Sequence, residues 1–278
     1  MIDLHLHTTA SDGTSTPTAL VAEAAGAGVE IFAVTDHDTV AAIQAATAAA
    51  AAAGLTCIPG IEITAVHGGR DVHMLGYFFD PDNPDLARFL DEQRADRRRR
   101  VTEMAVRLEE LGVPIDVAPL LATARRTSGK AVGRPGVAQA LVSAGHARDI
   151  GDAFDRYLGH GRPAFVERQG ATPAEVVQII AGAGGLSSLA HPGRTKLDEI
   201  IPELAASGLS ALEVFHPDHL PADSARYAAL AATHGLLTTG GSDYHGKHNP
   251  RSAHIGNKGI TRAMFDRLAA AAAAARPA

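Results

Sequence analysis

The stretch Ile2-Asp3-Leu4-His5-Leu6-His7 decides how the rest of the chain is interpreted. In an extended segment, neighbouring side chains point to opposite faces, so the two histidines share one face and the leucines lie on the other. Neutral imidazole nitrogen is a common ligand of divalent metals. A strand can also carry two solvated histidines, so the pair alone leaves both interpretations open.

Composition narrows the class of protein before other motifs are considered. The chain has 278 residues, 46% of them hydrophobic, which is typical of a globular protein with a sizeable core. A formal net charge of -6 argues against a general nucleic-acid or membrane coat, so an anionic substrate must meet a metal or a local basic cluster. The single cysteine, Cys57, excludes an internal disulfide and a thiolate-rich zinc site.

The start of the chain and its apolar runs bear on where the protein resides. A strand that begins at residue 2 leaves no room for a signal peptide, and no apolar run is long enough to span a bilayer. We therefore expect a cytoplasmic protein without membrane contact. Nothing in the pattern predicts a stable protein partner.

Short apolar segments alternate with alanine-rich helical segments in residues 1–80 and 164–278. Such alternation implies parallel strands covered by helices. An α/β barrel fits best, because the polar candidates follow the carboxyl ends of strands. The predicted strands are residues 2–7, 31–34, 57–63, 71–79, 186–190, 210–215 and 236–239.

Residues 81–163 break this alternation and carry no convincing strand. Their apolar spacing predicts helices at residues 86–111, 119–126, 135–144 and 150–158. We interpret the segment as an insertion that packs as a helical cap on a barrel domain formed by residues 1–80 and 164–278.

Histidines and carboxylates recur where the predicted strands end. They offer nitrogen and oxygen but no sulfur, which suits Mn, Zn or Fe. They outnumber the ligands of one ion, so a catalytic cluster of two or three metals is inferred. Closely spaced metals lower the pKa of a bridging water and polarise a phosphoryl oxygen. Any single candidate could instead be an ordinary histidine. The candidates are His5, His7, Asp12, His37, Glu62, His73, His191, Asp243 and His245.

Six motifs contain most of these candidates. They are His5-Leu6-His7, Thr35-Asp36-His37-Asp38, Gly60-Ile61-Glu62, His73-Met74-Leu75-Gly76, Ala190-His191-Pro192 and Ser242-Asp243-Tyr244-His245. In this order they resemble the successive motifs of the PHP (polymerase and histidinol phosphatase) family, over both halves of the chain outside the insertion. The resemblance implies a distorted seven-stranded βα barrel, in agreement with the strands above.

The resemblance also implies how the metals are shared. One ion would be held by His5, His7, Glu62 and Asp243, a second by Asp12, His37 and His245, and a third by Glu62, His73 and His191. Glu62 would then bridge two ions. Some family members have a histidine where this chain has Asp12, so the second position is richer in oxygen here, which favours Mn over Zn.

The helical insertion narrows the branch of the family. A cap between the His73 and His191 motifs resembles the stand-alone nucleoside 3′,5′-bisphosphate phosphatases. These form an RNase AM-like branch whose relatives include 5′-to-3′ exoribonucleases. The leading function is therefore a metal-dependent phosphatase that removes the 3′-phosphate of a substrate such as 3′,5′-adenosine bisphosphate.

The predicted cap supplies positive charge for the second phosphate. Arg134, with Lys130 nearby, precedes a proline at a predicted helix start, a position that favours anions. Arg97 lies on the apolar stripe of its helix and is expected to snorkel or pair within the cap. Arg99 and Arg100 leave that stripe, so they either face the cleft or form a solvated helix face.

Other histidines and other functions stay open at this point. His216 ends a predicted strand on the site face, where it would contact substrate, protonate a leaving group or merely lie nearby. Alternative functions are a phosphatase for another small monoester such as histidinol phosphate, a 5′-to-3′ exonuclease on short RNA, and a non-catalytic accessory module. The accessory module predicts missing ligands, whereas every family position is filled here. The histidines interpreted as solvated or as local caps are His67, His146, His160, His234, His248 and His254.

Overall fold

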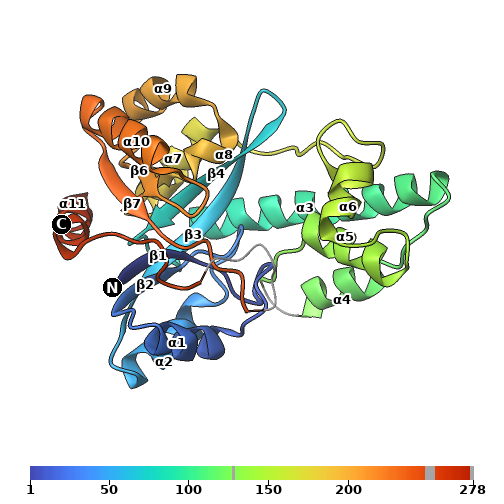
Figure 1. Ribbon diagram of the computed structural model, residues 1–278, viewed down its shortest axis with the longest axis horizontal. Coiled ribbons are helices and arrows are strands. Elements are labelled where there is room, and N and C mark those ends of the chain that lie inside the picture. The colour runs from blue at the N-terminus through green and yellow to red at the C-terminus, as the bar shows by residue number, and fades with distance from the viewer. Residues whose placement is uncertain (127–128, 248–253, 276–278) are drawn as a thin grey trace.

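The computed structural model describes residues 1–126, 129–247 and 254–275, and its seven strands form one sheet in sequential order (Figure 1). The segment after β7 lies against β1, where Tyr244 O accepts the N–H of His7 at 2.9 Å. The sheet is thereby almost closed, which confirms the predicted seven-stranded α/β barrel. The strands are β1 (Ile2–Leu6), β2 (Ile31–Val34), β3 (Thr56–His67), β4 (Arg70–Tyr77), β5 (Leu186–Leu189), β6 (Ala211–Phe215) and β7 (Leu237–Gly240).

One strand departs from the expected parallel arrangement. β4 runs antiparallel to both β3 and β5, whereas the other neighbouring strands pair in parallel. The prediction of parallel strands is therefore wrong for β4. Gly68 and Gly69, with φ of 56° and 74°, form a tight turn that joins β3 and β4 as a hairpin. The reversal brings the first half of β4, with His73, to the edge where the other strands end.

Helices cover the outside of the barrel, as the alternation predicts. Several begin with a proline in the first turn, where its missing N–H costs nothing; Thr16 and Thr172 cap two of these helices. No helix among the described residues is both long and apolar enough to cross a membrane. The barrel helices are α1 (Pro17–Gly26), α2 (Ile43–Ala52), α7 (Pro173–Gly182), α8 (Pro192–Thr195), η2 (Asp198–Ile200), α9 (Ile201–Ala206), α10 (Pro221–Thr233) and α11 (Arg262–Ala275).

The segment between β4 and α7 is helical, and its described residues contain no strand, as predicted. In Figure 1 these helices extend away from the N-terminus and α11. The elements are α3 (Pro84–Glu110), α4 (Ala118–Arg126), α5 (Arg134–Ser143), α6 (Ile150–Ala153) and the π-helical turn η1 (Phe154–Leu158). Their positions agree with the predicted helices to within a few residues.

The long helix α3 belongs to two apolar clusters. Leu86 and Leu90 pack with barrel residues, whereas Val101 and Met104 pack with the helices of the insertion. The second cluster also includes Leu141 of α5 and residues up to Val166. On this basis we propose that residues 81–163 form a cap subdomain that α3 anchors to the barrel.

Candidate metal centre and active site

The strand ends bring all nine candidate ligands into one group. β1 and the residue after it supply His5 and His7 on the same side, and the following loop supplies Asp12. Glu62 lies within β3, and the reversed β4 places His73 beside it. The remaining four candidates follow β2, β5 and β7 and are His37, His191, Asp243 and His245.

Glu62 lies at the centre of this group. Its side chain is 1% exposed, and five imidazole nitrogens lie 2.8–3.4 Å from its carboxylate oxygens. Oε2 faces His5, His7 and His37, and Oε1 faces His73 and His191. One buried carboxylate thus touches five histidines from four separate segments, as a bridging ligand must.

Three subsets have ligand atoms close enough together to share an ion. The first is His5, His7, Glu62 and Asp243, the second is His7, Asp12, His37 and His245, and the third is His37, Glu62 and His73. The first subset equals the ligand set that the family resemblance implies for the first ion. The second subset contains the three residues implied for the second ion, together with His7. The third contains His37 in place of His191, although His191 Nε2 still lies 3.0 Å from Glu62 Oε1.

The hydrogen bonding of these side chains fits a metal. Among the described residues, buried atoms without a hydrogen-bond partner include His5 Nε2, His7 Nε2, His37 Nδ1, Glu62 Oε2 and Asp12 Oδ1. Orphaned polar atoms are costly in a protein interior, and here they point at one another. Nitrogen and oxygen donors arranged in this way suit divalent Mn, Zn or Fe without selecting one.

The electrostatics of the group favour bound cations. Burial alone would raise the pKa of Glu62, but the imidazoles of His37, His73 and His5 hold that pKa well below its usual value. The carboxylate therefore stays ionised at neutral pH. Burial would likewise lower the pKa of His245, but Asp12 and Asp243 raise it to about 10. Carboxylates that attract a proton this strongly would also attract a metal ion.

Three residues at this site have backbone angles that non-glycine residues rarely adopt. Asp38, His191 and Asp243 have φ of 52°, 26° and 50°. Such conformations cost about 1–3 kcal/mol each and persist only where the surroundings impose them. Here Asp38 Oδ1 accepts the N–H of Thr64 at 2.9 Å, which helps to fix the turn after His37.

Four guanidinium groups lie beside the His73 end of the metal groups, and we call Arg97, Arg100, Arg134 and Arg168 the arginine cluster. Arg97 Nη2 donates to Thr64 Oγ1 at 3.1 Å, and Thr64 pairs with His73 across the β3–β4 hairpin. Cationic and metal-binding groups therefore meet at this hairpin.

A buried carboxylate, Asp38, and a partly buried one, Asp71, hold most of the arginine cluster in place. Arg97 Nε donates to Asp38 Oδ2 at 2.5 Å, and Arg168 Nη1 lies 3.5 Å from the same oxygen. Arg134 Nη2 donates to Asp71 Oδ2 at 2.8 Å, and Arg168 Nε lies 3.6 Å from Asp71 Oδ1. Burial would raise the pKa of Asp38, but Arg97 and Arg168 hold it below its ordinary value.

Arg100 is the member of the arginine cluster that has no ion pair with a carboxylate among the described residues. Its Nε donates to Val166 O at 3.0 Å, and its Nη2 is buried without a hydrogen-bond partner among the described residues. Burial, followed by the neighbouring Arg168, lowers its pKa to about 10. Four cations therefore face the two carboxylates of Asp38 and Asp71, which leaves positive charge available for an anion.

The other predicted substrate contacts have different surroundings. Arg99 pairs along its own helix with Asp96 at 2.5 Å and Glu103 at 2.9 Å, so it lies on a helix face and not in the arginine cluster. The loop of Lys130 lies against the Asp12 loop, because Ala131 N donates to Ala10 O at 3.0 Å. His216 is 1% exposed, and its Nε2 lies 3.3 Å from Asp243 Oδ2.

Several interactions escape sequence reasoning. Arg97 donates to Val132 O at 3.3 Å within the inserted segment, as expected, but its carboxylate partner is Asp38 of the barrel, which was not predicted. Arg168 was not predicted at all, because its partners Asp38 and Asp71 lie 130 and 97 positions away. A buried arginine in the segment that returns to the barrel carries no local motif.

The histidines interpreted as bystanders lie away from the metal groups wherever they are described. His146 contacts Pro114 O, and His160 packs against Phe165. His67 ends β3, His234 ends α10, and His254 is exposed. His248 lies outside the described residues.

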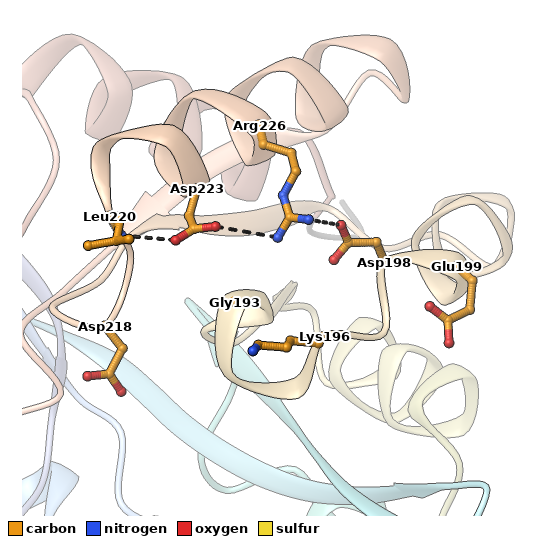
Figure 2. Close-up of a pocket in the computed structure, with 8 residues that line it drawn as sticks. All are labelled: Gly193, Lys196, Asp198, Glu199, Asp218, Leu220, Asp223 and Arg226. Carbon is orange, nitrogen blue, oxygen red and sulfur yellow. Dashed lines mark hydrogen bonds and ion pairs between the residues drawn. The ribbon is translucent and has the colours of Figure 1, made fainter.

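Arg194 links Asp243 to a neighbouring hollow. Arg194 Nη1 lies 3.2 Å from Asp243 Oδ2, and its Nε lies 3.4 Å from Asp218, which lines a hollow of about 620 Å³. Figure 2 shows Arg226 between Asp198 and Asp223, at 3.0 and 3.6 Å. The lining of the hollow contains four acidic and two basic residues, and none of them is a candidate metal ligand. This hollow is separate from the metal centre.

Comparisons with known proteins place this geometry in a family. The model of the PHP domain matches residues 3–115. The 5′-3′ exoribonuclease Rnm of Escherichia coli is 37% identical over 250 residues, which cover 87% of this chain and 84% of the relative. The chain belongs to the PHP domain family. The predicted resemblance is therefore confirmed.

Other relatives of this PHP domain protein carry different phosphoesterase names. The 3′,5′-nucleoside bisphosphate phosphatase of Chromobacterium violaceum is 35% identical, with 88% of this chain and 87% of the relative covered. A phosphoribosyl 1,2-cyclic phosphate 1,2-diphosphodiesterase of Eggerthella lenta is also 35% identical, with 91% and 97% covered.

The fold comparison agrees with the sequence comparison. A crystal structure from Bifidobacterium adolescentis, assigned as a metal-dependent phosphoesterase, superposes with a TM-score of 0.88 at 36% identity and covers 97% of this chain and 95% of its own. Together with the family match, these relatives show that this PHP domain protein is a metal-dependent phosphoesterase.

The thiol of Cys57 should play no part in this chemistry. It lies near the start of β3, away from Glu62, and burial raises its pKa to about 11. At neutral pH the thiol is therefore protonated and a poor nucleophile. We expect treatment with iodoacetamide at pH 7.5 to leave phosphate release unchanged. Inactivation of protein that remains folded by circular dichroism would contradict this expectation.

Proposed function

We propose that this PHP domain protein removes the 3′-phosphate from nucleoside 3′,5′-bisphosphates, such as 3′,5′-adenosine bisphosphate. The observation that supports the proposal most strongly is the contact between the metal-ligand groups and the arginine cluster. The arginine cluster lies beside the metal groups and is joined to them through Thr64 and Asp38. One phosphate can therefore lie at the metal groups while a second is held by guanidinium groups.

In the proposed active site, each ion has its own set of ligands. His5, His7, Glu62 and Asp243 would hold one, and Asp12, His37 and His245 a second. Glu62 and His73 would hold a third, with His37 or His191. The Asp12 carboxylate favours Mn at the position of the second ion, because it makes that donor set richer in oxygen. Bound divalent ions supply Lewis-acid stabilisation of the phosphoryl oxygens and a water of lowered pKa.

The side chains of the protein contribute orientation and charge. The near-complete burial of His5, His7 and Glu62 limits their movement and excludes bulk water from the ligand atoms. Arg100 Nη2, which has no hydrogen-bond partner among the described residues, is available to donate to a phosphate oxygen. Arg134 and Arg168 would add charge-assisted contacts, because guanidinium groups bind phosphate oxygens in pairs.

The names of the relatives support substrates with more than one phosphate. A nucleoside bisphosphate, an RNA and a phosphoribosyl cyclic phosphate share that property. A 5′-to-3′ exoribonuclease acting on short RNA is the second candidate, because the arginine cluster could equally hold the 5′-phosphate of an RNA end. If the substrate were histidinol phosphate, the arginine cluster would have no second phosphate to bind. If the protein were a non-catalytic accessory module, the complete set of candidate metal ligands would have no catalytic role.

A screen with Mn²⁺ tests the proposal by measuring inorganic phosphate released from the phosphate monoesters and free nucleotides released from the RNA, because hydrolysis of an RNA phosphodiester yields no inorganic phosphate. The substrates are 3′,5′-adenosine bisphosphate, AMP, histidinol phosphate and a short 5′-phosphorylated RNA. We expect the bisphosphate to give the highest kcat/KM, EDTA to abolish release and added Mn²⁺ to restore it. Preference for RNA would support the exoribonuclease, and preference for histidinol phosphate would reject a role of the arginine cluster in substrate choice.

A further inference from the structure

Three buried residues lie behind the proposed metal ligands: two of them contact ligands directly, and the third contacts the turn that follows His191. They are Glu213 in β6 and His216 and His219 in the loop that follows, at 0%, 1% and 3% exposure. None belongs to the three metal-ligand groups. We call Glu213, His216 and His219 the β6 set.

Glu213 joins two distant parts of the metal centre. Its Oε1 accepts from His5 Nδ1 at 2.8 Å, and its Oε2 accepts the backbone N–H of His191 at 2.7 Å. Because the Nδ1 proton of His5 is donated to Glu213, the neutral ring keeps the Nε2 lone pair for a metal. The second contact holds His191 in its positive-φ conformation, which the backbone would otherwise avoid.

His216 orients Asp243 in a similar way. Its Nδ1 accepts the N–H of Asp218 at 3.1 Å, so the proton of the neutral ring lies on Nε2. That nitrogen faces Asp243 Oδ2 at 3.3 Å. The other oxygen, Oδ1, lies 3.3 Å from His5 Nε2 and 3.2 Å from His7 Nε2, on the side of the ions.

His219 holds the turn that begins at His191. Its Nδ1 donates to Val214 O at 2.9 Å, and its Nε2 accepts the N–H of Gly193 at 3.0 Å. A Cβ atom at Gly193 would lie 2.6 Å from the His219 ring, so the two residues pack without room for a side chain.

We propose that the β6 set consists of positioning residues, which fix the orientation of His5, of Asp243 and of the turn at His191 before any ion binds. The proposal rests on the ligands proposed above but not on the choice of substrate. Its test is therefore metal binding, measured without substrate.

The main test is a Glu213→Gln substitution in metal-free protein titrated with Co²⁺. An amide has one acceptor oxygen and cannot accept both N–H groups, so it either releases His191 or forces the His5 proton onto Nε2. We expect the dissociation constant, from competition with a chelating dye, to rise about 10- to 100-fold, and the visible Co²⁺ spectrum to change. The matched control is Glu175→Gln, which alters a carboxylate that accepts Thr172 N–H at 2.8 Å in the α7 cap, and should change neither readout.

A second pair of variants tests His216. His216→Gln keeps an N–H donor near Asp243 Oδ2 and should retain the affinity for Co²⁺, whereas His216→Leu should weaken it about tenfold. If Glu213→Gln does not fold, this pair decides, and equal affinities of the two His216 variants would overturn the proposal. A folded Glu213→Gln protein with an unchanged affinity for Co²⁺ and an unchanged Co²⁺ spectrum would also overturn the proposal, whatever its stability. Absence of Co²⁺ binding by the unmodified protein would instead contradict the proposed ligands themselves.

Discussion

Substitution of Glu62 by Gln should abolish most activity and reduce the amount of bound metal. The change removes one negative charge from a carboxylate that contacts five imidazoles, and it turns an amide N–H₂ toward their nitrogens. Loss of this ligand weakens binding of the ions that stabilise the transition state, so we expect kcat/KM to fall by about two to four orders of magnitude, which equals about 3–5 kcal/mol of transition-state stabilisation. Phosphate release and metal content after dialysis measure the two effects.

The control for this experiment is Glu103→Gln. Glu103 carries the same side chain on α3, where it pairs with Arg99 and is half exposed. This variant should keep full activity and metal content, because surface ion pairs contribute little. A Glu62→Gln protein with unchanged metal content and activity would remove Glu62 from the proposed site.

Substitution of Arg134 by Ala should weaken use of the bisphosphate without affecting a simple monoester. Arg134 is held by Asp71 at 2.8 Å, and its guanidinium carbon lies 5.8 and 5.5 Å from the ring centroids of Phe154 and Phe165. A charge-assisted hydrogen bond contributes about 1.5–3 kcal/mol, so kcat/KM for the bisphosphate should fall about ten- to a hundredfold. A simple phosphate monoester has no second phosphate for Arg134 to bind, so its kcat/KM should not change.

Arg156→Ala provides a matched control within the same helical segment. Arg156 likewise bonds a carboxylate, Asp152 at 3.2 Å, and lies 4.7 Å from the ring of Tyr157, but it does not belong to the arginine cluster. It should leave both substrates unaffected. An equal loss for both substrates in Arg134→Ala would assign Arg134 to chemistry or folding. No loss for either would place the second phosphate elsewhere and reopen the histidinol phosphate hypothesis.

The strands and helices could be predicted because periodicity is a local property of the chain. The direction of β4 could not be derived in that way, since an alternating pattern reads the same along a parallel and an antiparallel strand. A usable signal was present: Gly68 and Gly69 lie between two strand-like segments, a pattern typical of a hairpin. Assigning that turn would have reversed β4 and explained why His73 lies inside a strand.

The candidate metal ligands could be predicted because they lie in short motifs at strand ends. The arginine cluster was only half found. Arg100 and Arg134 were proposed from local patterns, but Arg168 pairs with residues distant in sequence, and Arg97 crosses from α3 to Asp38. Helical phase indicated that Arg97 is buried, yet it could not name the partner. Contacts between segments depend on tertiary packing, which no local period encodes.

The contact between Arg97 and Asp38 limits how modular this protein is. Excision of residues 81–163, or their exchange for the segment of another protein, would remove Arg97 and leave the fully buried Asp38 with Arg168 at 3.5 Å as its remaining cationic partner. That carboxylate directly follows His37 in the chain. A chimaera would therefore need a cation grafted at the position of Arg97, or the barrel would carry an under-neutralised charge next to its own metal site.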